Sequence, residues 1–157
     1  MRVYKAPARY VWDESDVLLF LAGSIEMGKA DNWQSRITRK LEDERDLVIL
    51  NPRRDDWDSS WEQSIKNPQF KEQVEWELDG LELADTIILY FDPNTKSPIS
   101  LLELGLHARE DKMIVVCPDG FWRKGNVDIV CKRFNIPLYN SFDDYKKKGI
   151  NCRNHEQ

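Results

Sequence analysis

Residues 86–108 read TIILYFDPNTKSPISLLELGLHA, and this stretch predicts one strand–loop–helix unit. The β-branched and aromatic residues at its start favour a strand, which ends in a loop of Pro, Asn, Lys and Ser. Serine is a preferred helix N-cap, so we expect a helix to begin at Ser100, with Glu103 in its first turn. In open α/β folds such a loop and helix start lie at the carboxyl edge of a parallel sheet, where ligands bind.

Glu103 is therefore the first candidate for a catalytic residue. The first turn of a helix favours negative charge, so we expect this carboxylate to stay ionised and to be nucleophilic. Many helix starts carry a glutamate that has no chemical role, and that interpretation stays open at this point.

The rest of the chain alternates apolar runs with helical patterns. Further strands are expected at residues 17–22, 47–50, 113–117 and 136–139, with an edge strand near Val3 or Tyr10. Helical patterns cover residues 33–41, 68–83, 127–134 and 142–148. Continuous apolar runs such as VLLFLA are typical of strands buried on both faces. We therefore predict an α/β fold in which helices flank a parallel sheet of five strands, as a single domain over residues 1–157.

Two loops after predicted strands contain candidate substrate-binding residues. Gly23, Ser24 and Ile25 follow the strand 17–22, and backbone N–H groups in such a loop can face an anion or a sugar hydroxyl. An ordinary strand-to-helix turn explains these residues equally well. Asn51 and Arg53 follow the strand 47–50 and could reach a ligand above the sheet; alternatively, the arginines here pair with the nearby aspartates.

Glu77 is the second candidate for a catalytic residue. In the helical pattern 68–83, the apolar residues predict a buried stripe: Phe70, Val74, Leu78 and Leu81. Glu77 lies beside this stripe, where a carboxylate costs free energy unless it has partners or a function. The alternative is that Glu77 simply accepts hydrogen bonds from a neighbouring backbone group or arginine.

Composition excludes several classes of function. The net charge is −5 and basic residues cluster only at Lys146–Lys148, so nucleic-acid binding is not expected. No apolar run approaches the ~20 residues of a membrane span, and no signal-peptide pattern is present, which predicts a cytoplasmic protein without a membrane partner. The cysteines lack CxxC spacing and the histidines lack partners at metal-ligand spacing, so we predict reduced thiols and no metal: Cys117, Cys131, Cys152, His107 and His155.

Several motifs, taken in order, resemble the nucleoside 2-deoxyribosyltransferase superfamily in its 2-deoxyribosyltransferase-like branch. A strand ends in AGSI, Glu77 precedes Asp85 of an Ala-Asp pair by eight residues, and ELG at 103–105 follows the Ser/Pro loop. The sequence Gly-Asn-Val at 125–127 adds support, and the resemblance spans roughly residues 18–138.

This resemblance implies a flavodoxin-like, Rossmann-like three-layer sandwich that forms dimers or larger homo-oligomers. Glu103 inherits the role of nucleophile, and Glu77 that of the acid that contacts the leaving base, where relatives more often have Asp. Asn126 resembles an asparagine that some members contribute to the neighbouring subunit's site. No cofactor is expected. A flavin-binding domain of flavodoxin type is a further possibility, and it is disfavoured because the first loop lacks the Ser/Thr-rich phosphate cradle.

The resemblance leaves the substrate open between nucleosides and nucleoside 5′-monophosphates. Nucleoside-specific transferases carry an aspartate for a sugar hydroxyl six residues before the nucleophile, where this chain has Ser97. Relatives that cleave monophosphates often have serine there, where it helps to bind phosphate, and they share the GSI loop. Ser97 and Ser24 therefore favour nucleotides slightly.

The implied reaction is cleavage of an N-glycosidic bond. Glu103 attacks C1′ to form a covalent glycosyl-enzyme, while Glu77, its pKa raised by apolar neighbours, protonates the base. A second nucleobase then gives transfer, whereas water gives hydrolysis. A non-catalytic nucleotide-binding or sensing module is the alternative from a different class. The aromatic residues near these loops either stack on a base or simply pack: Trp33, Trp57 and Phe121.

Overall fold

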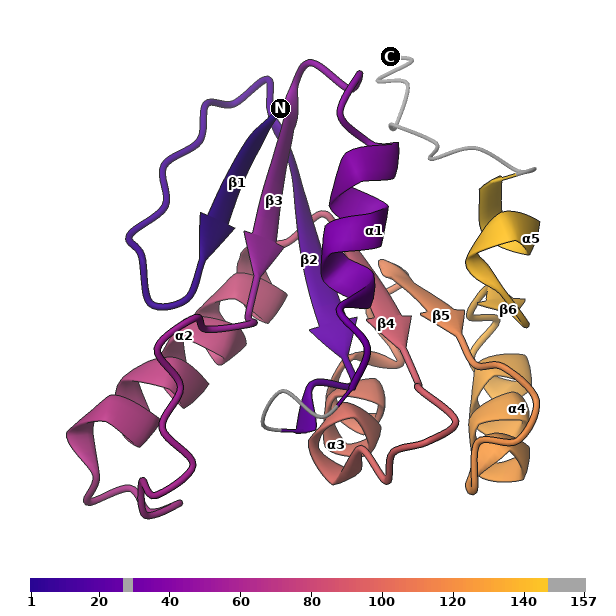
Figure 1. The fold of residues 1–157 in the computed structure, drawn as a ribbon. Coiled ribbons are helices and arrows are strands. Elements are labelled where there is room, and N and C mark those ends of the chain that lie inside the picture. The colour runs from indigo at the N-terminus through magenta and orange to yellow at the C-terminus, as the bar shows by residue number, and fades with distance from the viewer. Residues whose placement is uncertain (27–29, 147–157) are drawn as a thin grey trace.

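The computed structural model describes residues 1–26 and 30–146, and six parallel strands in these ranges form one sheet (Figure 1). The strands are β1 (Arg2–Lys5), β2 (Val17–Gly23), β3 (Leu47–Asn51), β4 (Thr86–Tyr90), β5 (Met113–Val116) and β6 (Leu138–Tyr139). Their order is β1-β3-β2-β4-β5-β6. Without β1 this is the flavodoxin-like order 2-1-3-4-5, so the predicted fold class is confirmed.

The sheet has one strand more than the five predicted. β1 pairs with β3 from Arg2 opposite Val48 to Lys5 opposite Asn51. Its side chains alternate between half-buried and exposed, as expected for an edge strand with one face toward solvent. The edge strand expected near Val3 is thus present, whereas Tyr10 lies outside any strand and packs edge-on against Trp76.

Helices cover both faces of the sheet (Figure 1). They are α1 (Trp33–Lys40), α2 (Pro68–Leu83), α3 (Pro98–His107), α4 (Lys124–Arg133) and α5 (Phe142–Lys146). Leu18 and Phe20 of β2 point into a core shared with α2, α3 and α4. The alternate residues Leu19 and Leu21 point into a second core, shared with α1 and α5. Strands buried on both faces explain the continuous apolar runs of the sequence.

The buried face of α2 differs from the predicted one. Its buried residues are Gln73, Trp76, Gly80 and Leu81, whereas Leu78 is 41% exposed. A Cβ on Gly80 would lie 2.7 Å from the Phe20 ring, so glycine lets α2 pack closely on the sheet. The stripe through Phe70, Val74 and Leu78 was therefore wrong, and the correct face places Glu77 nearer the core, between Gln73 and Leu81.

Some sequence predictions fall outside the described residues, namely Cys152, His155 and the last two residues of the helix expected at 142–148.

Cys117 and Cys131 are buried free thiols. Within the described ranges, no helix is both long and apolar enough to span a membrane.

Candidate active site

The candidate site lies where the sheet order reverses, at the carboxyl ends of β2 and β4. Gly23 closes β2 beside Tyr90 with φ +134°, and a Cβ there would lie 2.2 Å from the Tyr90 carbonyl oxygen. Only glycine fits this position. The close approach lets the Ser24 N–H donate to the Tyr90 carbonyl at 2.9 Å, while Ile25 next to it is half-buried.

Three buried hydroxyls connect the loops after β2 and β4. Thr95 Oγ1 lies 3.0 Å from Ser24 Oγ and 2.7 Å from Ser97 Oγ, and Ser24 Oγ also accepts from the Asp92 N–H at 2.8 Å. Ser24 and Ser97 are 1% and 3% exposed. Both serines thus have partners within the protein, and their role toward a substrate stays a prediction.

Glu26 adds a contact between these loops that sequence reasoning missed. Its carboxylate accepts hydrogen bonds from the backbone N–H groups of Lys96 and Ser97, each at 2.6 Å. These two N–H groups lie at the start of α3, a position that attracts anions. A protein carboxylate therefore already occupies these donors, and no local pattern predicts a contact across 70 residues of chain.

Glu103 lies in the second turn of α3, so the predicted helix start at Ser100 was wrong. α3 begins at Pro98, and Ser97 precedes it in the left-handed region, with φ 46° and ψ 54°. Proline favours the first helical position because its φ is fixed and its missing N–H costs nothing there. Glu103 consequently lies deeper in the helix and is only 8% exposed.

The ionised state expected for Glu103 was also wrong. Burial, together with the charge of Glu77, raises the pKa of Glu103 to about 8. Within the described residues, no hydrogen bond or ion pair reaches its carboxylate. Near neutral pH the free protein therefore holds this carboxyl mainly protonated.

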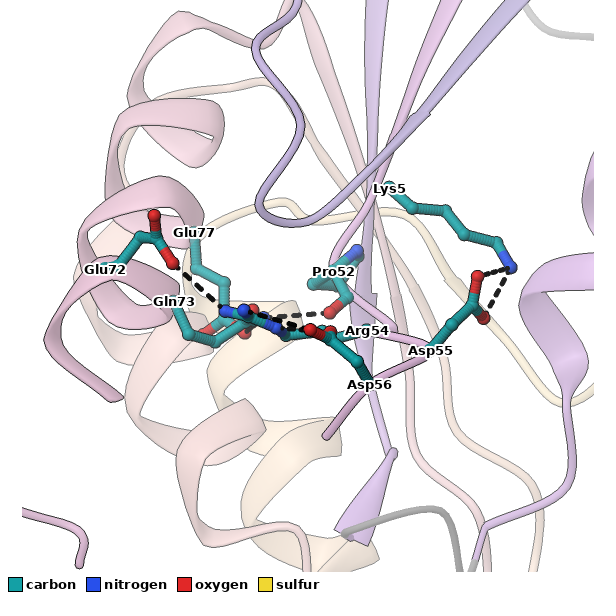
Figure 2. Close-up of polar contacts among 8 residues, drawn as sticks. All are labelled: Lys5, Pro52, Arg54, Asp55, Asp56, Glu72, Gln73 and Glu77. Atoms are coloured by element: carbon teal, nitrogen blue, oxygen red, sulfur yellow. Dashed lines mark hydrogen bonds and ion pairs between the residues drawn. The ribbon is translucent and has the colours of Figure 1, made fainter. Parts of the chain in front are cut away.

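Glu77 has the raised pKa that was predicted for it. Burial raises the pKa to about 7, and a hydrogen bond from Gln73 opposes part of that rise. Gln73 Nε2 donates to Glu77 Oε1 at 2.7 Å (Figure 2). Glu77 thus accepts a hydrogen bond within the protein, as one of the two interpretations expected. The donor is a side-chain amide, however, and not a backbone group or an arginine.

The two acids form an electrostatically coupled pair although α2 and α3 carry them 26 residues apart. Both pKa values are raised, to about 7 for Glu77 and about 8 for Glu103. Between these values the pair holds about one proton, which belongs to both groups rather than to one. A site with one acidic proton and one carboxylate charge can supply a general acid and a nucleophile together.

The segment after β3 anchors α2 next to Glu77 (Figure 2). Arg54 binds Asp56 at 2.6 Å and Glu72 of α2 at 3.2 Å, and it stacks over the Trp61 ring. Gln73 donates to the Pro52 carbonyl at 2.9 Å. Sequence reasoning overlooked Gln73, although its position four residues before Glu77 places both on one helix face.

Asn51 and Arg53 contact the α1 side of the sheet instead. Asn51 shares the orientation of Ile49, which points into the core with α1, and its Oδ1 accepts from the Arg53 N–H at 3.0 Å. The Arg53 guanidinium donates to Gln34 of α1 and to the Ala30 carbonyl. These contacts lie across the sheet from α2 and α3, and the substrate-binding role of both residues stays a prediction.

Asn126 lies on the surface of α4 rather than beside the acids. It is exposed and lines a groove between α3 and α4 together with Leu101 and Gly105. This outward position is compatible with a contribution to a second subunit.

The aromatic candidates are occupied within the fold. Trp33 is fully buried, and its Nε1 donates to the Ser24 carbonyl at 3.0 Å. Phe121 is 3% exposed and packs on Phe91. Packing is thus confirmed for these two side chains, and Trp57 contacts Trp61.

Comparison with known families supports the resemblance seen in the motifs. A family model described as nucleoside 2-deoxyribosyltransferase like matches residues 16–121, about two thirds of the chain. The matched range runs from the start of β2 to the loop before α4 and includes Glu77 and Glu103. No curated protein matches this sequence.

Proposed function

The chain belongs to the nucleoside 2-deoxyribosyltransferase-like family, and on this basis we propose that it cleaves the N-glycosidic bond of a (deoxy)nucleoside and transfers the sugar to another nucleobase. The observation that carries this proposal is the coupled pair of Glu77 and Glu103 at the switch point of the sheet. Small-molecule nucleosides and nucleobases are the substrates that the family implies.

In the first step, a carboxylate oxygen of Glu103 attacks C1′ of the sugar. The C1′–N bond breaks, its electron pair passes to the base nitrogen, and the proton of Glu77 neutralises the leaving base. The product is a glycosyl ester on Glu103. In the second step a nitrogen of the incoming base attacks C1′, gives its proton to Glu77, and releases the Glu103 carboxylate.

This mechanism requires the single proton of the pair to lie on Glu77. In the free protein Glu103 has the higher pKa, so the proton lies mainly on Glu103. The positive charge that develops at C1′ favours the ionised form of the adjacent carboxyl. We propose that bound substrate thereby moves the proton from Glu103 to Glu77 as the glycosidic bond weakens.

The contact of Glu26 favours nucleosides over their 5′-monophosphates. A phosphate at the start of α3 would need the N–H groups of Lys96 and Ser97, which already donate to the Glu26 carboxylate. The hydroxyls of Ser24 and Ser97 are likewise engaged within the protein. Cleavage of a monophosphate by water stays the second candidate, because the motif around Ser97 resembles that of such hydrolases.

The surface of α3 supports the expected homo-oligomer. Ile99, Leu102 and Leu106 follow one side of the helix and are each more than half exposed. A Cβ added to Gly105 on the same surface would meet no atom within 4 Å in the described structure, although glycine inside a helix costs about 1 kcal/mol. We propose that a second copy covers this face and brings its Asn126 toward the site.

Incubation with deoxyinosine, with and without adenine, followed by chromatography tests the proposed function. Formation of deoxyadenosine only when adenine is present supports transfer, and free hypoxanthine alone indicates hydrolysis. The Glu103→Ala variant should lose both activities, whereas Glu62→Ala on the exposed loop should keep them. No turnover of any nucleoside or monophosphate by the wild-type protein would favour the sensing module.

A further inference from the structure

The side chain of Gln73 is held between the end of β3 and the acid Glu77. It is 4% exposed, and its Nε2 donates to the Pro52 carbonyl at 2.9 Å and to Glu77 Oε1 at 2.7 Å (Figure 2). Both acceptors are oxygens, so only the NH₂ group of the amide can face them. The amide orientation is therefore fixed, and one N–H points at the carboxyl of Glu77.

The other end of this amide has no partner. Within the described residues, Gln73 Oε1 is buried without a hydrogen bond. A buried, unsatisfied acceptor destabilises a fold. The amide is thus only partly satisfied, and costly buried polar groups of this kind are expected where function requires them.

A hydrogen bond donated to a carboxyl group is stronger when the group is ionised. Glu77 becomes ionised when it gives its proton to the leaving base. The N–H of Gln73 is therefore aimed at the atom that gains charge during the reaction, in a buried position where such a bond is strong. This contact makes Glu77 a stronger acid than burial alone would allow.

We propose that Gln73 is the positioning residue of the general acid: it fixes the Glu77 carboxyl against the end of β3 and stabilises the carboxylate that proton transfer leaves behind. This inference rests on the proposed function. The charged group that acts on Glu77 is Glu103 of α3, which repels its carboxylate. Arg54 after β3 is paired with Asp56 and with Glu72 of α2.

The Gln73→Met variant tests the proposal, because it keeps the side-chain size and removes both donors. We expect kcat for deoxyinosine cleavage to fall about 10- to 100-fold, the range for one lost hydrogen bond to a charged group. The pH–rate profile should move to higher pH, since the pKa of Glu77 loses the bond that lowers it. Folding stability should fall, because the Pro52 carbonyl and the Glu77 carboxyl both lose their donor. The shift of the pH–rate profile, which a purely structural role would not produce, is therefore the decisive readout.

Two comparisons make this test specific. Gln69→Met, one turn earlier on the same face of α2 but exposed to solvent, should leave kcat and the pH profile unchanged. In a Glu77→Gln background, Gln73→Met should lower kcat no further, because the acid it serves is gone.

An NMR titration of the Glu77 carboxyl in the free protein provides a readout that needs no substrate. We expect its pKa in Gln73→Met to lie above that of the wild type. Wild-type turnover combined with an unchanged pKa and pH profile in Gln73→Met would overturn the role of Gln73 alone. Absence of turnover by the wild-type protein would instead overturn the proposed function, and the role of Gln73 with it.

Discussion

Replacing Glu103 with glutamine should stabilise the protein at alkaline pH and leave its stability unchanged at acidic pH. The folded pKa of Glu103, about 8, lies above its ordinary value of 4.5. A carboxyl group of this kind contributes full stability below pH 4.5, and that contribution is lost as the pH rises through about 8. Glutamine keeps the shape of the side chain and carries no charge at any pH.

The size of the effect follows from the pKa. At about 1.4 kcal/mol per pH unit, ionising Glu103 costs the folded state about 5 kcal/mol more than the unfolded chain. Part of this cost is repulsion by Glu77, because the charge of Glu77 contributes to the raised pKa. Glu103→Gln should therefore gain up to about 5 kcal/mol in its free energy of unfolding above pH 8.

Urea unfolding of wild type and Glu103→Gln at pH 5 and pH 9 measures this difference. We expect nearly equal free energies of unfolding at pH 5 and a clear advantage of the variant at pH 9. The exposed Glu62→Gln should show no such pH-dependent difference. If Glu103→Gln changed the free energy of unfolding equally at both pH values, or lowered it at pH 9, the reasoning would be refuted. Glu103 would then not be a buried carboxyl group without a partner for its charge.

Three further predictions concern the same site. Turnover should follow a bell-shaped pH profile with limbs near 7 and 8, since the pair of Glu77 and Glu103 must hold one proton; a flat rate from pH 5 to 10 would contradict this. Glu26→Gln should raise kcat/KM for deoxyinosine 5′-monophosphate relative to deoxyinosine, because the N–H groups at the start of α3 then face a neutral group; an unchanged ratio would contradict the role of Glu26. Gly23→Ala should lower the free energy of unfolding by at least about 2 kcal/mol, through strain at φ +134° and the clash with Tyr90; wild-type stability in urea would contradict the close approach.

The layers of this fold were predictable from the sequence, because a strand that is buried on both faces appears as a continuous run of apolar residues. Runs such as VLLFLA and LVIL are strands in the structure, and their lack of alternation correctly indicated helices on both sides. β1 was harder to identify, because an edge strand needs few apolar residues and RVYK contains no continuous run. Its assignment depends on pairing with β3, which is distant in sequence.

The two corrected helices show where local rules compete. For α3, Pro98 at the first helical position was a better indicator of the helix start than Ser100, and the difference moved Glu103 out of the first turn. For α2, the spacing of the apolar residues predicted that Leu78 is buried, whereas Trp76 is buried in the structure. The close packing of Gly80 on Phe20 decides the orientation of that helix, and no local pattern contains that contact.

The candidate site was predictable as a list of residues and less so as an arrangement. The motifs predicted that Glu77 and Glu103 belong to one site, and in the structure the charge of Glu77 raises the pKa of Glu103. The pairing of Glu26 with the start of α3 joins two loops whose relative position only the fold defines. Arg53 is placed on the α1 side by strand alternation through Asn51, which a closer count along β3 would have indicated.

Trapping the covalent intermediate tests the central claim most directly. Wild-type protein is incubated with a deoxynucleoside without an acceptor base, quenched in acid, digested and examined by mass spectrometry. We predict a deoxyribosyl adduct on the peptide that contains Glu103, absent from Glu103→Gln and discharged by added adenine. Steady turnover with no adduct on this peptide, or with an adduct on a different residue, would contradict the account.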